Sequence, residues 1–81
     1  MDVRRVIEAA LREVDTTATL AECVAEPDGP GYVVRVSVAG ELTRSARVPD
    51  LLVARAHQGH PIAQFALRAV LASMVAGLQG R

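Results

Sequence analysis

The stretch YVVRVSVA, residues 32–39, decides the fold of this chain. Alternate residues share one side of an extended strand, and one side here is wholly apolar: Tyr32, Val34, Val36 and Val38. The other side carries Val33, Arg35 and Ser37. This period of two is typical of a strand with one face on a core and the other towards solvent. The rest of the chain is therefore expected to supply a core for one face of a sheet.

A second strand is expected upstream, over residues 19–26. An extended conformation is favoured because Pro27–Gly31, which reads PDGPG, is too rich in breakers to continue a helix. In this strand we expect Leu20 and Val24 to share one face. The other face then holds Ala21, Cys23 and Ala25.

A third strand is predicted over residues 42–48, after a tight turn at residues 40–41. Two registers are compatible with that turn. A strict two-residue turn would place Val38 opposite Thr43, whereas a three-residue loop would place Val38 opposite Leu42. We favour the longer loop because it gives the better core. In that register the buried face holds Leu42, Ala46 and Val48, with Arg44 interrupting it.

The first helix is predicted over residues 3–14. Its apolar side chains recur three and four positions apart, as on one buried stripe, and Asp2 stands where a capping residue is favoured. After the third strand ends at Pro49, we expect Asp50 to cap a short helix over residues 51–57.

The last helix is predicted to open at Pro61, because proline is tolerated in the first turn, and to run to about residues 76–78. Gly77 and Gly80 are its expected stop signals. The element order is therefore α-β-β-β-α-α. It predicts a single α+β domain over residues 1–81, with a three-stranded antiparallel meander and helices packed on one of its faces.

The composition favours a small folded protein whose core is built from small side chains. The chain has 81 residues, of which 51% are hydrophobic, and its nine basic and nine acidic residues cancel. Alanine and valine supply most of the apolar residues, and the aromatic residues are Tyr32 and Phe65. Such a core buries little area per residue, so an isolated monomer is expected to be marginal and association favourable.

The last predicted helix is apolar almost all the way round, and among its residues only Gln64 and Arg68 form a polar patch. One face, which we expect to lie on the sheet, holds Ile62, Phe65, Ala66, Ala69, Val70, Ala72, Ser73 and Ala76. The apolar side chains left for something else to cover are Leu67, Leu71, Met74, Val75 and Leu78. A helix lying on a single sheet needs only one apolar stripe, so the second face indicates a further contact.

Three occupants are compatible with that second face: the other helices of the same chain, a second copy, or a different protein or ligand. We favour a two-fold homodimer in which this helix packs against its mate. The sequence does not divide the candidate residues between core and interface. The residues expected to supply the association surface are Ile62, Phe65, Leu67, Leu71, Met74, Val75 and Leu78.

The residues that carry chemistry indicate neither a metal site nor a catalytic site. His57, His60 and Cys23 are the only soft metal ligands, and they lack the spacing of a structural zinc site. Cys23 has apolar neighbours, which favour a structural thiol over a nucleophile. The carboxylates are scattered, and the glycine-rich turn has neither the lysine nor the strand-to-helix context of a phosphate loop. We therefore expect a non-catalytic protein without a metal or cofactor.

An alternative function is the binding of nucleic acid or another anion. The sheet-borne and neighbouring arginines that would serve it are Arg35, Arg44, Arg47 and Arg55. The order helix, three antiparallel strands, helix over residues 3–78 resembles the double-stranded-RNA-binding domain. In that family a lysine-rich cluster opening the last helix grips phosphates. The matching stretch here, residues 58–64, reads QGHPIAQ and holds no lysine or arginine, so no site is carried over.

The expected location is the cytoplasm. A single cysteine cannot form an intrachain disulfide, and the N-terminus enters an amphipathic pattern instead of the apolar core of a signal peptide. The most apolar stretch, residues 62–78, is short for a membrane span and includes polar residues. The sequence thus favours a cytoplasmic accessory protein whose partner is itself or another protein; nucleic acid is the less favoured partner, and no membrane is expected.

Overall fold

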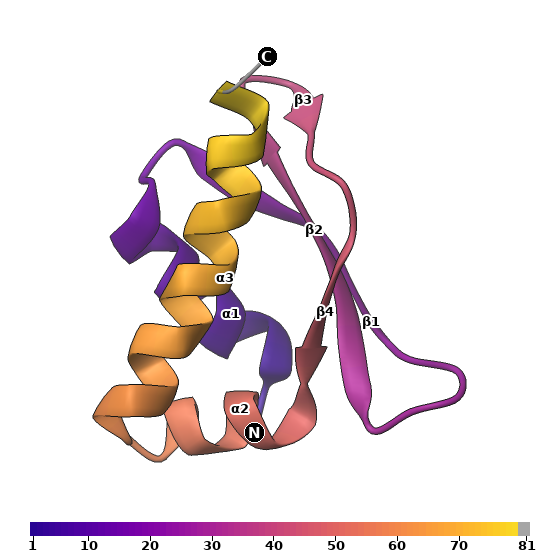
Figure 1. The fold of residues 1–81 in the computed structure, drawn as a ribbon, viewed down its shortest axis with the longest axis vertical. Helices are drawn as coiled ribbons and strands as arrows, with labels where there is room; N and C mark the ends of the chain where they lie inside the picture. The colour runs from indigo at the N-terminus through magenta and orange to yellow at the C-terminus, as the bar shows by residue number, and fades with distance from the viewer. Residues whose placement is uncertain (80–81) are drawn as a thin grey trace.

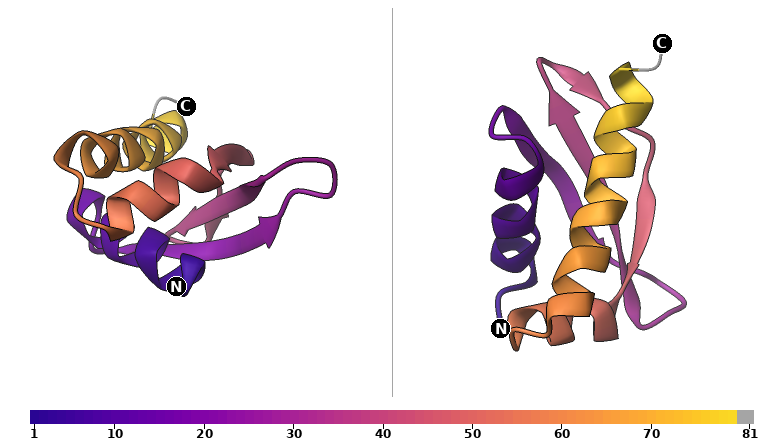
Figure 2. Two further views of the ribbon diagram at one scale, coloured as in Figure 1. Left: turned by 90° about the horizontal axis from the view of Figure 1, so that it is seen from below. Right: turned by 60° about the vertical axis from the view of Figure 1, so that its left-hand side comes forward.

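A computed structural model describes residues 1–79 and confirms the predicted mixed α+β architecture (Figure 1). Within that range, three helices pack against an antiparallel sheet. Helices α1 and α3 run side by side, and α2 lies across one end of the pair (Figures 1 and 2). The elements in chain order are α1 (Val3–Val14), β1 (Ala18–Ala25), β2 (Gly31–Val38), β3 (Glu41–Leu42), β4 (Ala46–Pro49), α2 (Asp50–His57) and α3 (Pro61–Gln79).

Strand β2 is the centre of the sheet. It pairs with β1 along one edge and with both β3 and β4 along the other. The predicted third strand is therefore present as one lane of the sheet, interrupted between β3 and β4. Leu42 lies opposite Ser37, and Ala46 lies opposite Val34. Between these two pairs the lane has one residue more than β2 has. That extra residue is a bulge.

Both registers considered for the third strand are wrong, because the turn lies one residue earlier than expected. Val38 pairs with Glu41, and the turn residues between them are Ala39 and Gly40. Their φ angles are 52° and 83°, so both have the left-handed conformation of the tight hairpin turn that matches strand twist. Leu42 consequently lies outside the predicted core, with 51% of its surface exposed.

A second irregularity reverses the predicted faces of β1. Leu20 lies opposite Val36, and Glu22 lies opposite the next residue of β2, so one residue of β1 is extra. Past this bulge, every side chain changes face. Cys23 packs against the core, and Val24 is 51% exposed on the outer side of the sheet. The expectation that Leu20 and Val24 share one face is therefore wrong.

The core lies between the sheet and the three helices. Val34 and Val36 are fully buried, which confirms the alternation on β2 that the sequence predicts. The largest fully buried side chains are Ile7, Leu11, Leu67, Leu71, Val34, Val36, Val48 and Val53. The opposite face of the sheet carries exposed side chains, among them Glu22, Val24, Arg35 and Arg47. The molecule is thus a layer of helices on one face of a sheet (Figure 2).

The helix ends follow the sequence with one small shift. Asp2 caps α1, since its carboxylate accepts a hydrogen bond from the backbone N–H of Arg5 at 3.3 Å. Pro49, not Asp50, occupies the capping position of α2, and the Asp50 carboxylate accepts from the N–H of Leu51 at 2.8 Å. Helix α3 begins at Pro61 as predicted but continues through Gly77. Gly80, the other expected stop signal, lies outside the described residues.

Candidate association surface

Helix α3 buries one stripe of side chains four residues apart: Ala63, Leu67, Leu71 and Val75. The side chains on the opposite side of the helix are exposed, and we call them the outer face of α3: Ile62, Phe65, Ala69, Ala72, Ser73 and Ala76. The predicted sheet-facing set is therefore wrong, because most of it forms this outer face. The side chains assigned to a contact away from the sheet, such as Leu67 and Leu71, are the ones that pack in the core.

The reason for this orientation is the size of the side chains along each face. From Leu67 onward the buried stripe, with the half-buried Val70 and Met74 beside it, offers branched or long side chains. The outer face offers large side chains only at Ile62 and Phe65, near the start of the helix, and then alanine and serine. Burying the first set removes more apolar area from water, so the helix turns it inward.

The seven predicted interface residues divide into three groups. Leu67, Leu71 and Val75 are in the core, with 1%, 0% and 5% exposure. Met74 and Leu78 are half-buried. Ile62 and Phe65 lie on the surface, with 84% and 68% of their area exposed. These two are the most exposed residues of the predicted set.

The outer face is continuous and carries no charge. From Ile62 to Ala76 it follows about 21 Å of helix at ~1.5 Å per residue. Solvated helices normally carry charged or polar residues on the side away from the core. Ser73 is the polar side chain on this one. A long uncharged strip headed by two large exposed side chains is typical of an interaction surface.

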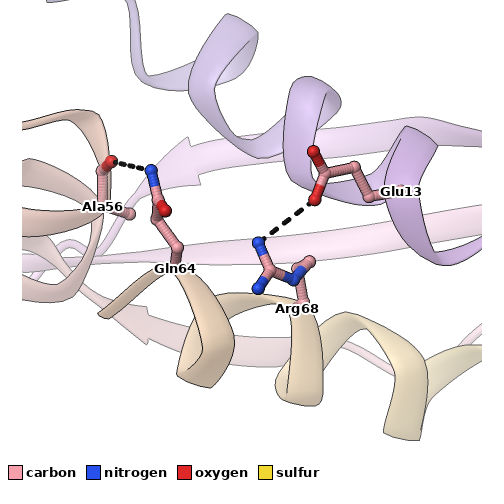
Figure 3. A network of polar contacts seen from close by, with 4 residues as sticks. All are labelled: Glu13, Ala56, Gln64 and Arg68. Carbon is pink, nitrogen blue, oxygen red and sulfur yellow. Dashed lines mark hydrogen bonds and ion pairs between the residues drawn. The ribbon is translucent and has the colours of Figure 1, made fainter. Parts of the chain in front are cut away.

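The polar flank of α3 is used by the fold itself (Figure 3). The Nε2 atom of Gln64 donates to the carbonyl oxygen of Ala56 on α2 at 3.2 Å. Arg68 Nη1 donates to the Glu13 carboxylate on α1 at 3.1 Å. These bonds cross a cavity of about 270 Å³ between the three helices, with His57 also in its wall. That volume is below the ~300–1,000 Å³ of usual ligand pockets, so we assign the cavity no ligand.

An open, mostly apolar groove of about 680 Å³ lies along the other flank, between α2 and the start of α3. Its walls include Leu51, Leu52, Ile62 and Ala66, and Arg55 and His60 stand among them. Leu51 is 54% exposed. The groove therefore extends the apolar surface of α3 sideways onto α2.

The arginines of the alternative function do not form one surface. Arg35 and Arg47 are exposed on the outer face of the sheet, Arg44 is exposed between β3 and β4, and Arg55 is exposed on α2. Arg47 pairs with Glu26 at 2.7 Å, and this hydrogen-bonded carboxylate raises the pKa of Arg47. Glu22 lies opposite Arg35 in the register. Thr43, between β3 and β4, is buried and adds no polar group to the outer face beside these arginines.

The side chains weighed for metal or thiol chemistry lie apart. Cys23 is half-buried against the core, and burial raises the pKa of its thiol above the ordinary value of 9.0. His57 and His60 are exposed and line different hollows. Within residues 1–79, no three histidine, cysteine or acidic side chains lie close enough together to hold a metal ion.

By length and composition alone, α3 is also apolar enough to cross a membrane. The window Pro61–Leu78 has a mean hydropathy of 1.5, and 22% of it is buried. The core helix of a soluble protein passes the same test, so this is weak evidence for a span.

No protein-family model, curated protein or solved structure matches the chain.

Proposed function

We propose that this chain is a non-catalytic association module that forms a homodimer through the outer face of α3. The observation that supports the proposal is the exposure of Ile62 and Phe65, at 84% and 68%, at the head of an uncharged helix face. Covering that face removes apolar area from water, which is the main driving force of association. Self-association requires a surface that meets its own copy, as two-fold dimers do.

The small core gives the association a second reason. Its fully buried side chains are no larger than leucine or isoleucine, and the single phenylalanine is on the surface. A domain of this size has a narrow margin of stability, and binding a second folded copy adds to it by mass action. The lone thiol of Cys23 is compatible with a reducing compartment, so we place the dimer in the cytoplasm.

Light scattering on a sizing column, over a wide range of protein concentration, tests this proposal. The wild type is expected to have a mass near twice 8.6 kDa, and raising the salt concentration is expected to weaken it little. Phe65→Glu places a charge on the outer face and is expected to give a folded monomer. A wild type that is monomeric at every concentration contradicts the proposal.

Val24→Glu is the matched control. It also introduces a glutamate in place of an exposed large apolar residue, but on the open face of the sheet. We expect this variant to remain a dimer. If Val24→Glu gives the monomer and Phe65→Glu does not, the sheet face forms the dimer and α3 does not. Far-UV circular dichroism shows that each variant is folded.

A further inference from the structure

The outer face of α3 is graded in size along its length. Its two large side chains, Ile62 and Phe65, lie in the N-terminal half. From Ala69 onward every side chain on this face is small. The positions 62, 65, 69, 72 and 76 alternate steps of three and four residues, which is the spacing of a helix that packs along another helix.

We infer that two copies of α3 pack antiparallel, with the two-fold axis beside Ala69. This inference rests on the proposed dimer and assigns its geometry. Residues at equal distances before and after Ala69 then face each other. Ile62 lies opposite Ala76 of the second copy, and Phe65 lies level with Ser73 and against Ala72 of the second copy. The bulky half of each helix thus packs on the small half of the other.

A parallel pair fits the same surface less well. It places Ile62 on Ile62 and Phe65 on Phe65, so the large side chains hold the two helices apart at one end. At the other end alanines face alanines, and the gap left between them forfeits dispersion contacts. The antiparallel pair keeps the summed size of facing side chains similar along the contact. Complementary size is what close helix packing requires.

The charges beside the face are compatible with this arrangement. Arg68 is one residue from Ala69, and it is paired with Glu13 at 3.1 Å. When two helices pack antiparallel about a two-fold axis, the side of α3 that faces α1 lies on the same side of the pair in both copies. Two complete pairs of opposite charge therefore meet next to the axis, and no unpaired charge is brought into the contact there. Burying a charge with its partner avoids the desolvation penalty of a lone ion.

A second copy that lies along this helix also reaches the apolar groove beside it. A standard interface buries ~800 Å² per partner, roughly a sixth of the 5133 Å² surface of this chain. A single helix face is narrow for that area. The groove beside Ile62, with Leu51 and Leu52 in its wall, lies where the small C-terminal half of the second α3 arrives. Contact with α2 then widens the interface.

Disulfide trapping tests the orientation. All variants carry Cys23→Ala, so that the native thiol does not react. Ile62→Cys and Ala76→Cys proteins are oxidised separately and as a mixture. The antiparallel pair predicts covalent dimer in the mixture at a rate on the order of tenfold above either protein alone, because only unlike chains bring the thiols together. Ser45→Cys, exposed between β3 and β4, is the control for random collision.

Each outcome supports or overturns the inference. Rapid linking of Ile62→Cys to itself shows a parallel pair, which overturns the orientation and leaves the dimer. Light scattering that shows a dimer, with no linking above the Ser45→Cys control, overturns the use of α3. A chain that stays monomeric overturns the proposed function and this geometry with it. Binding of such a monomer to lipid vesicles identifies a membrane surface as the occupant instead.

Discussion

The hydroxyl of Thr43 accepts a hydrogen bond from the backbone N–H of Val36 at 3.1 Å, and the backbone N–H of Thr43 donates to the carbonyl oxygen of Val36 at 2.9 Å. This reciprocal pair lies where the lane of β3 and β4 is interrupted. The side chain supplies the acceptor that a regular strand partner would have offered. Thr43 is 5% exposed, so the bond is made away from water.

Thr43→Val is therefore expected to destabilise the fold by ~1–3 kcal/mol, because it leaves the buried N–H of Val36 without an acceptor. Valine keeps the shape of threonine, so the loss is not one of packing. Thr43→Ser restores the acceptor and is expected to recover most of the stability. Urea unfolding at equilibrium measures both. Equal stability of Thr43→Val and the wild type contradicts this role.

The two bulges explain why part of the fold was not predictable from the sequence. The alternation on β2 is local, and the structure confirms it. A bulge adds one residue relative to the partner strand, so it depends on two segments at once. Its effect is to change the face of everything beyond it. The bulge in β1 places Val24 on the outer face, away from Leu20, and the early turn at Ala39 and Gly40 leaves Leu42 51% exposed although the sequence predicts it in the core.

The candidate surface was predictable in part for a different reason. A helix that is apolar all round is recognisable in sequence, but its period does not show which side meets the sheet. Residue size decides it in the structure: the stripe through Leu67 and Leu71 is buried, and the face with Ile62 is not. Comparing the volumes of the two faces along the helix would have indicated this orientation.

Gly31 is expected to resist substitution. A Cβ atom at this position would lie 2.8 Å from the carbonyl oxygen of Val48 and would also meet the Glu26 carboxylate. The carbonyl belongs to the sheet and has no freedom to move aside. Gly31→Ala is therefore expected to cost ~1–3 kcal/mol of unfolding free energy, as overpacking does.

Gly29→Ala is the control for that substitution. A Cβ atom there meets only side-chain atoms, with the Glu26 carboxylate the nearest at 2.9 Å, and a side-chain carboxylate can shift with its partner Arg47 more easily than backbone can. We expect a change in the urea midpoint much smaller than that of Gly31→Ala. If both variants lose the same stability, the backbone of Val48 is not the obstacle.

Asp15 is expected to make stability depend on pH in the acid range. The hydroxyl of Thr17 donates to its carboxylate at 2.7 Å and the Thr17 N–H donates at 2.8 Å, and these bonds lower the pKa of Asp15 below the ordinary 3.8. A carboxylate with a lowered pKa in the fold contributes stability above its unfolded pKa. That contribution is lost as the pH falls through the folded value.

The measurement compares the thermal midpoints of the wild type and Asp15→Ala at pH 7 and near pH 3. The variant is expected to melt below the wild type at pH 7, and the gap is expected to narrow at low pH. Asp15→Asn keeps an oxygen acceptor without the charge, so its difference from Asp15→Ala should not vary with pH. A gap that widens on acidification has the wrong sign for this account.

Substitutions of Leu71 and Phe65 are expected to depend differently on protein concentration, although both are apolar residues of α3. Leu71 is fully buried, so Leu71→Ala leaves a cavity and is expected to cost ~2–5 kcal/mol at every protein concentration. Phe65 is 68% exposed, so Phe65→Ala is expected to change the stability of the dilute monomer by only ~0.5 kcal/mol.

As the protein is concentrated, the melting midpoint of the wild type should rise and that of Phe65→Ala should lag behind it, because association stabilises only the form that dimerises. Thermal unfolding by circular dichroism at several concentrations measures this divergence. A Phe65→Ala midpoint that stays parallel to the wild type places the association surface elsewhere.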